Sequence, residues 1–368
     1  VESTPTHHLS VEDYAAGWRL SCASKPASDV VVQVPAIASA YQSRMKTADL
    51  STGEEVATFN KLQEDIRAAG VEISCDFVSA VLELSEPTLD DTMPDTERLE
   101  LAAHPACDGS TDGTPTYHTV KQLAKTLREA NFKVQIAGTL DMGVLTVMDV
   151  TGKLDAPMIG CAIDIGTTTV TGVLLNLETG ELVAKASSGN GQIRYGADVI
   201  NRIIEQSKPG GVKRLQDAIL KETLVPLTAV MCKSAGITAD RIFRASVASN
   251  TTMNHLLLGV DANPVRMEPY IPTFFQWRGM VAKDLGFVAN PDAEILIAPN
   301  IGSYVGGDIT AGTFASLIWN KDEFSLFIDL GTNGELVFGN RDFMMSCACS
   351  AGPAFEGGDA RRDRELRA

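Results

Sequence analysis

The chain has 368 residues and a formal net charge of −16, because 47 acidic residues outnumber 31 basic ones. This length is enough for two or three domains with cores of their own. The acidic balance argues against non-specific binding to nucleic acids or acidic membranes. No apolar run reaches the roughly 18 residues that predict a membrane span.

Cysteine usage and the first residues bear on the compartment. The seven cysteines are scattered along the chain, at positions 22, 75, 107, 161, 232, 347 and 349. No Cys-x-x-Cys pair occurs, which is typical of a reducing compartment rather than of a disulfide framework. The stretch from Val1 to Pro5 lacks the charged and apolar regions of a signal peptide. We therefore expect a cytoplasmic protein.

Residues 1–35 contain little apolar sequence from which a core could form. Ser10 is a plausible N-cap for a short helix that ends near Trp18. The run 29–35 predicts a strand that ends at a proline. Cys22 lies between these elements in an Arg-Leu-Ser-Cys segment, and from its position alone it could be an ordinary buried residue. Residues 36–60 are polar and predict a linker.

Residues 61–155 predict a compact α/β domain. The stretch 61–70 is a helix ended by glycine, and the apolar residues of 119–130 recur at the spacing of an amphipathic helix. Three apolar stretches predict strands, at 77–84, 134–137 and 143–150.

The stretch 158–177 predicts a β-hairpin with a small polar tip. An apolar strand ends at Asp164, three threonines follow Gly166, and a second apolar run begins at Val170. Glycine lets a backbone approach a ligand closely. The hydroxyls and N–H groups of Thr167, Thr168 and Thr169 are the kind of donors that hold phosphate. Asp164, at the end of the strand, could hold Mg²⁺ directly or through water.

A second hairpin of this design lies at 324–340, where Asp329, Gly331, Thr332, Asn333 and Gly334 again separate two apolar strands. Such a turn often only joins two strands, so one copy would be weak evidence. Two copies suggest facing phosphate loops in duplicated halves. The pattern resembles the two phosphate loops of the superfamily that includes actin, sugar kinases and heat-shock ATPases.

Three further turns lie between these two hairpins, each near the predicted start of a helix. Asp198 opens a helix, where its charge suits the positive N-terminal end. Residues 245–255 predict a strand, a polar turn and a helix. In that turn, Asn250 and Thr251 could contact a phosphate or could simply cap the helix. His255 lies among leucines and is expected in the core. Residues 302–312 form a glycine-rich turn that contains an aspartate and precedes a helix.

Together these residues resemble one branch of the superfamily, the reductive activators of corrinoid proteins. The resemblance rests on six motifs, which are 164–169, 195–198, 249–253, 304–312, 329–335 and 350–357. It implies an α/β fold in which 156–368 belong to an actin-like, ribonuclease H-like ATPase domain. The family carries a [2Fe–2S] domain, of which 1–35 would be the tail and Cys22 one cluster ligand.

The family also implies a function and site roles. It uses ATP and Mg²⁺ to reduce Co(II) to Co(I) on a corrinoid protein or corrinoid-dependent methyltransferase, with electrons from a low-potential donor. Asp164 and Asp329 would be the catalytic carboxylates for Mg²⁺ and the attacking water. Phosphates would be held by the two loops and the polar turn, through Gly166, Thr167, Thr168, Thr169, Asn250, Thr251, Gly331, Thr332, Asn333 and Gly334. A homodimer is left open.

Two departures from the family pattern limit these expectations. A [2Fe–2S] cluster needs four thiolates, and the three cysteines expected before Cys22 are not in the sequence, so we expect residues 1–368 to bind no cluster. The adenosine-binding glycines are expected beyond Gly358. Two alternatives stay open, a small-molecule kinase of the same superfamily and a nucleotide-gated binding module without turnover.

Overall fold

The computed structural model describes residues 2–3, 14–19, 24–25, 27–28, 45–48, 50, 53–73, 76–107, 113–331 and 333–350. The chain divides into two compact units, Val1–Gln42 and Ser43–Ala368. In the first unit, β1 (Glu2–Ser3) pairs with β2 (Ser24–Lys25) in antiparallel fashion. Cys22 and the strand expected over 29–35 lie outside the described residues.

A four-stranded sheet and two helices form the α/β domain predicted after the linker. The sheet order is β4 (Phe77–Glu83), β6 (Lys133–Asp141), β7 (Val144–Thr151) and β5 (Gly113–Pro115). Only the β5–β7 pair is parallel within this sheet. The helices α4 (Asp95–Ala103) and α5 (Tyr117–Glu129) bury Leu99, Leu123 and Leu127 against it. The strands predicted here and the amphipathic helix are confirmed.

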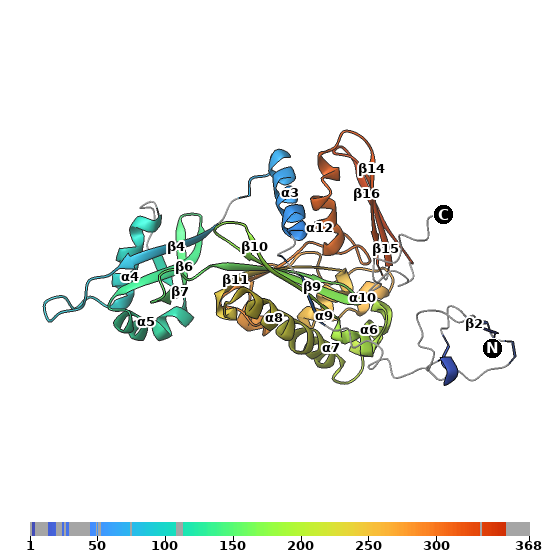
Figure 1. The fold of residues 1–368 in the computed structure, drawn as a ribbon, viewed down its shortest axis with the longest axis horizontal. Helices are drawn as coiled ribbons and strands as arrows, with labels where there is room; N and C mark the ends of the chain where they lie inside the picture. Colours follow the sequence, from blue (N-terminus) through green and yellow to red (C-terminus); the bar gives the residue numbers. More distant parts are fainter. Residues whose placement is uncertain are drawn as a thin grey trace. The chain divides into compact units, whose positions relative to one another are not determined.

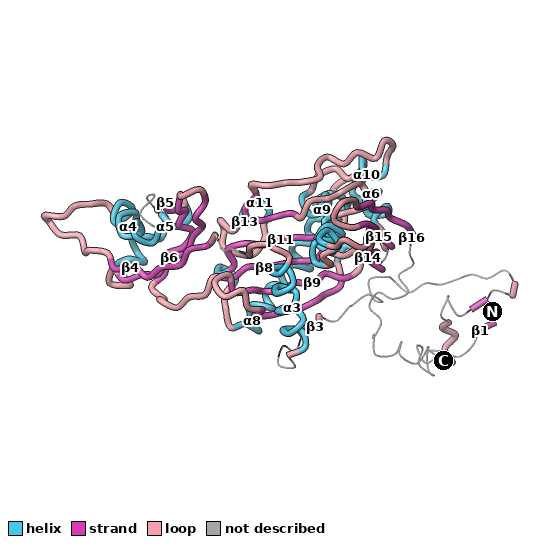
Figure 2. Tube along the Cα trace, turned by 90° about the horizontal axis from the view of Figure 1, so that it is seen from above, coloured by secondary structure: helices cyan, strands magenta, loops and turns pink. Residues whose placement is uncertain are grey.

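A seven-stranded sheet forms the centre of the second unit, in the order β12, β13, β11, β8, β9, β10, β3. Its strands are β3 (Lys46–Thr47), β8 (Ile159–Ile165), β9 (Thr169–Asn176), β10 (Leu182–Gly189), β11 (Ile242–Ser249), β12 (Met280–Val281) and β13 (Glu294–Ile297). The strands β8, β9 and β10 form an antiparallel meander, and β11 and β13 continue the sheet in parallel with β8. Figure 2 shows β13, β11, β8 and β9 side by side in this order. This is the ribonuclease H-like topology, and the predicted fold class is confirmed.

Helices cover the seven-stranded sheet and bury its apolar residues. They are α6 (Val199–Gln206), α7 (Gly211–Ile219), α8 (Val225–Ala235), α9 (Thr251–Leu258), α10 (Asn263–Arg266) and α11 (Ala282–Leu285). A π-helical turn, Leu220–Leu224, joins α7 to α8 just before Pro226, whose ring cannot fit a regular helix interior. In Figure 1, α7 and α8 lie on one side of the sheet and α3 (Glu54–Ala68) lies on the other.

The helix α3 begins at Glu54, seven residues earlier than the sequence predicted. Its N-cap is Gly53, whose φ of 73° and missing side chain give no capping signal to a sequence pattern. Glu54 and Glu55 suit the positive end of the helix. Lys185 of β10 pairs with Glu55, and this contact supports the extra turns. Gln63, within the predicted part of the helix, donates to the carbonyl of Gly180 at 2.9 Å.

A third sheet carries the second predicted hairpin. It consists of β14 (Ser325–Leu330), β15 (Asn333–Gly339) and β16 (Met344–Ser350), all antiparallel. The helix α12 (Gly307–Ala315) packs on it through a small core of Val305, Ile309, Ile318 and Val337. No helix among the described residues is long and apolar enough to cross a membrane.

Candidate nucleotide site

Four chain segments that are far apart in the sequence meet around one pocket of ≈250 Å³. They are the β8–β9 hairpin, the β11–α9 junction, the start of α12 and the β14–β15 hairpin. The pocket is lined by Asp164, Gly166, Thr167, Thr169, Asn250, Asp308, Asp329, Leu330, Gly331, Asn333 and Glu335. The two predicted loops therefore do face a common space.

The two hairpins share an Asp-x-Gly sequence at their tips, although their turns differ in length by one residue. The strand β8 places Asp164 two residues before Gly166, and β14 places Asp329 two residues before Gly331. The Gly166 N–H donates to the Thr169 carbonyl at 2.9 Å, and the Gly331 N–H donates to the Asn333 carbonyl at 2.9 Å. A Cβ on Gly166 would lie 2.6 Å from that Thr169 oxygen, so the first turn requires glycine.

The β11–α9 junction contributes Asn250, which caps α9 and also lies at the pocket. Its side-chain oxygen accepts from the Thr252 N–H at 3.0 Å and caps α9, and the residue also lines the pocket. Thr251 is fully buried, and its hydroxyl donates to the Gly302 carbonyl at 2.6 Å. Thr251 does not line the pocket, so we assign it to the support of the junction rather than to ligand contact.

The start of α12 brings Asp308 to the pocket through two close backbone approaches. A Cβ on Gly306 would lie 2.4 Å from the Asn250 Cα, and a Cβ on Gly307 would lie 2.6 Å from the Ala298 carbonyl oxygen. Gly306 thus lets the helix start directly against the β11–α9 junction, and Gly307 lets it pack against the residue that follows β13. From the sequence, Asp308 is only an aspartate at a glycine-rich helix start. The packing of this helix start brings it to the pocket.

The second hairpin adds Asp329 and Glu335, which are opposite each other across β14 and β15. Both line the pocket, and Glu335 is buried. Gly334 pairs with Leu330 and does not line the pocket, and Thr332 lies outside the described residues. Glu335 was missed as a site residue, although the alternation of a strand puts it on the same face as Asn333.

Like charges and limited solvation determine the protonation of these carboxyls. The Asp164 side chain is exposed to the pocket, but the surrounding protein, and then Asp308 and Asp329, raise its pKa to about 7. Burial also raises the pKa of Asp308 to about 6, with a further contribution from Asp329. An added cation would relieve this repulsion.

These donors fit a magnesium ion that arrives with a nucleotide. Among the described residues, no group of three or more His, Cys, Asp or Glu side chains is arranged to hold a metal by itself. Mg²⁺ keeps several waters and binds through one or two carboxylates together with substrate phosphates. Asp164, Asp308 and Asp329 form such an open carboxylate set beside loops suited to phosphate.

His255 belongs to the core, as predicted. It is fully buried and stacks on Phe274 with the ring centroids 4.4 Å apart. Its Nε2 accepts from the Thr273 N–H at 3.2 Å, so Nδ1 carries the proton and donates to the Thr251 carbonyl at 2.8 Å. Burial lowers the pKa of His255, which is consistent with a neutral, structural imidazole.

The fold and the paired hairpins are those of actin-like ATPase domains. Three family models then match in sequence order, the RACo linker region at residues 58–155, the RACo middle region at 159–321, and the C-terminal ASKHA domain of RACo at 323–362. The chain belongs to the RACo family. The α/β domain described above corresponds to the region that the family models call the linker.

Two relatives are similar to this chain over different spans. The corrinoid activation enzyme RamQ from Eubacterium limosum is 34% identical over 204 residues, which cover 55% of this chain and 34% of RamQ. The solved structure of a reductive activator for a corrinoid, iron–sulfur protein is 34% identical with a TM-score of 0.66, and the match covers 97% of this chain and 56% of that one. This chain therefore spans about a third to a half of the length of these relatives.

Proposed function

We propose that this chain carries the phosphate- and magnesium-binding part of an ATP-driven activator that reduces Co(II) to Co(I) on a corrinoid protein. The observation that supports this most strongly is the convergence of two Asp-x-Gly hairpins on one pocket that also contains Asp308. The relatives support the corrinoid partner, because one is called a corrinoid activation enzyme and the other a reductive activator for a corrinoid, iron–sulfur protein.

In this proposal, hydrolysis depends on positioning and on charge neutralisation rather than on a nucleophilic side chain. The loop residues Gly166, Thr167 and Asn333 hold phosphate oxygens, and Asp164 and Asp329 orient the waters of Mg²⁺ and the attacking water. When bound, Mg²⁺ neutralises charge on the phosphates. ATP binding then biases a two-state complex with the partner, which can help an otherwise unfavourable electron transfer.

The test is an anaerobic assay of the complete protein with a Co(II) corrinoid protein, ATP and a low-potential electron donor. We expect the Co(II) electron paramagnetic resonance signal to disappear only with ATP, in step with phosphate release. Hydrolysis that requires a small phosphoryl acceptor, and leaves cobalt unchanged, would instead support the kinase alternative. ATP binding without any turnover would support the nucleotide-gated module.

Cys22 is proposed as one of four thiolate ligands of a [2Fe–2S] cluster in the complete protein. The motive is its Arg-Leu-Ser-Cys segment, and the cluster would supply a one-electron carrier. Iron content and the visible spectrum of Cys22→Ser test the assignment. A cluster with unchanged spectrum and stoichiometry would remove Cys22 from the ligand set.

A further inference from the structure

The polypeptide behind the β8–β9 phosphate loop contains a buried asparagine that fixes the direction of two loop carbonyls. Asn190 follows β10 directly, at the point where Gly189 pairs with Thr169. It is 2% exposed and does not line the pocket. Its side-chain Nδ2 donates to the Gly166 carbonyl at 2.9 Å, and its backbone N–H donates to the Thr168 carbonyl at 2.8 Å.

The intervening carbonyl, that of Thr167, is held by Arg202. This arginine is fully buried in α6, and its Nη2 donates to the Thr167 carbonyl while its Nε donates to the Gly196 carbonyl at 2.9 Å. Three successive loop carbonyls, 166 to 168, are therefore bonded to donors outside the pocket. A carbonyl that turned into the pocket would place its negative end toward phosphate oxygens.

Asn190 is itself held in one orientation by two further contacts. Its Oδ1 accepts from the Gln192 N–H at 2.9 Å, so the amide nitrogen must point to Gly166. The next residue, Gly191, donates through its N–H to the Thr223 hydroxyl at 3.0 Å. That hydroxyl in turn donates to the Ala218 carbonyl at 2.8 Å across the π-helical turn between α7 and α8. The helix pair thus anchors the segment that carries Asn190.

We propose that Asn190 is a positioning residue for nucleotide phosphates. Its side-chain amide turns the Gly166 carbonyl away from the pocket, its backbone N–H does the same for the Thr168 carbonyl, and the loop is thereby presented to the anion. The inference rests on the proposed nucleotide function and deepens it. Asn190 touches no ligand itself, and its effect is transmitted through the backbone of 166–168.

Two substitutions separate this role from helix capping. Asp and Ser are good N-caps like Asn, so Asn190→Asp and Asn190→Ser both keep an acceptor for the Gln192 N–H. The aspartate replaces the donor to Gly166 with an acceptor, whereas the serine hydroxyl retains a donor of shorter reach. Thr116→Ala is the matched control, because it removes the N-cap of α5, whose Thr119 N–H bond is 3.3 Å, in the other domain.

The first measurement is hydrogen–deuterium exchange of the nucleotide-free complete protein, over peptides that contain 165–170. We expect exchange there to increase at least tenfold in Asn190→Asp, less in Asn190→Ser, and not at all in Thr116→Ala. Unchanged exchange in Asn190→Asp would overturn the positioning role. This measurement does not depend on the proposed function, because no nucleotide is present.

The second measurement is the dissociation constant of MgATP and of adenosine by calorimetry. We expect Asn190→Asp to weaken MgATP binding about tenfold or more and to leave adenosine binding unchanged, with Thr116→Ala like the wild type. Equal loss for both ligands, or no loss, would overturn the inference. A wild-type protein that binds no MgATP would instead refute the proposed function, and the exchange result would still report on the loop. If Asn190→Asp fails to fold, Asn190→Ser decides the question by the same two measurements.

Discussion

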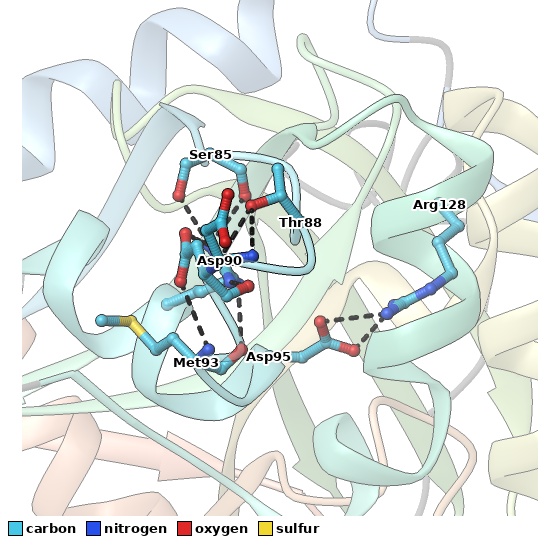
Figure 3. Close-up of polar contacts among 8 residues, drawn as sticks. Ser85, Thr88, Asp90, Met93, Asp95 and Arg128 are labelled. Atoms are coloured by element: carbon cyan, nitrogen blue, oxygen red, sulfur yellow. Dashed lines mark hydrogen bonds and ion pairs between the residues drawn. The ribbon is translucent and has the colours of Figure 1, made fainter.

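The Arg98 cluster of the linker-region domain and the carboxylates of the nucleotide pocket are both partly buried polar groups, but their charges are arranged in opposite ways. Arg98 is 3% exposed and bonds to the carboxylate of Asp91 at 2.7 Å, to the Ser85 hydroxyl at 2.7 Å and to three backbone carbonyls. Figure 3 shows Ser85, Thr88, Asp90 and Met93 close together in the loop that supplies these partners, with Arg128 paired to Asp95 beside it. In the pocket, Asp164 and Asp308 instead meet other carboxylates.

The pKa values follow this difference. The hydrogen bond from Arg98 lowers the pKa of Asp91, whereas limited solvation and like charges raise the pKa of Asp164 to about 7. A cluster whose charges are matched within the chain needs no ligand and holds a loop in place. A cluster of like charges is costly to the fold and gains from a cation. The Arg98 cluster therefore fits a structural role, whereas the pocket carboxylates fit the proposed binding role.

Removing one pocket carboxylate should have the largest effect on activity. Asp164→Asn or Asp329→Asn should reduce ATP hydrolysis by the complete protein about 100-fold, by analogy with other electrostatic catalytic groups. Phosphate release at saturating MgATP measures this. A variant with normal specific activity and a much lower melting temperature would show that the carboxylate is structural.

Removing Arg98 from the Arg98 cluster should reduce stability rather than activity. Arg98→Met leaves the carbonyls of Ser85, Asp91 and Met93 without their donor, and we expect a lower free energy of unfolding, by an amount that is limited because water can reach these partners. Urea denaturation gives the value, and ATP hydrolysis per folded protein should stay at the wild-type level. Lost hydrolysis without lost stability would break the distinction between the two clusters.

The raised pKa values predict how metal affinity depends on pH. A carboxyl with a pKa of about 7 is neutral below that pH, so protons compete with Mg²⁺ as the pH falls from 8 to 6. We expect the affinity for MgATP to weaken about tenfold over this range. Asp164→Asn is the control. In this variant the nucleotide still titrates but the side chain at position 164 does not, so its affinity for MgATP should change less with pH. Equal slopes for both proteins would remove Asp164 from the metal site.

The smallest expected effect concerns stability without nucleotide. A carboxyl whose pKa is raised by folding destabilises the native state once the pH exceeds its ordinary value, and fully so above about 7. Asp164→Asn should therefore stabilise the empty protein at pH 8 by at most about 1 kcal/mol, because this exposed side chain is screened by solvent. The gain should shrink toward pH 5, and a clear loss of stability at pH 8 would contradict the account.

Sequence patterns predicted the fold and the two hairpins that meet at the pocket, for reasons visible in particular residues. Glycine spacing and apolar runs are local signals, so both hairpins and the Asn250 turn were predicted before their packing was known. Asp308 and Glu335 were missed because their role depends on contacts between segments, namely the approach of Gly306 to Asn250 and the pairing of Asp329 with Glu335. Asn190 was missed for the same reason, since its partners at 166 and 168 are in the loop between β8 and β9, more than 20 residues earlier in the chain.

The central claim is that the two hairpins together hold a metal–nucleotide complex, and Mn²⁺ in place of Mg²⁺ tests it most directly. Electron paramagnetic resonance of free Mn²⁺ would be recorded during titration of the complete protein, with and without a non-hydrolysable ATP analogue. We predict tight binding of one Mn²⁺ with the analogue, much weaker binding without it, and a loss of about 100-fold in affinity in both Asp164→Asn and Asp329→Asn. Undiminished Mn²⁺ binding with the analogue in either variant would contradict a site built from both hairpins.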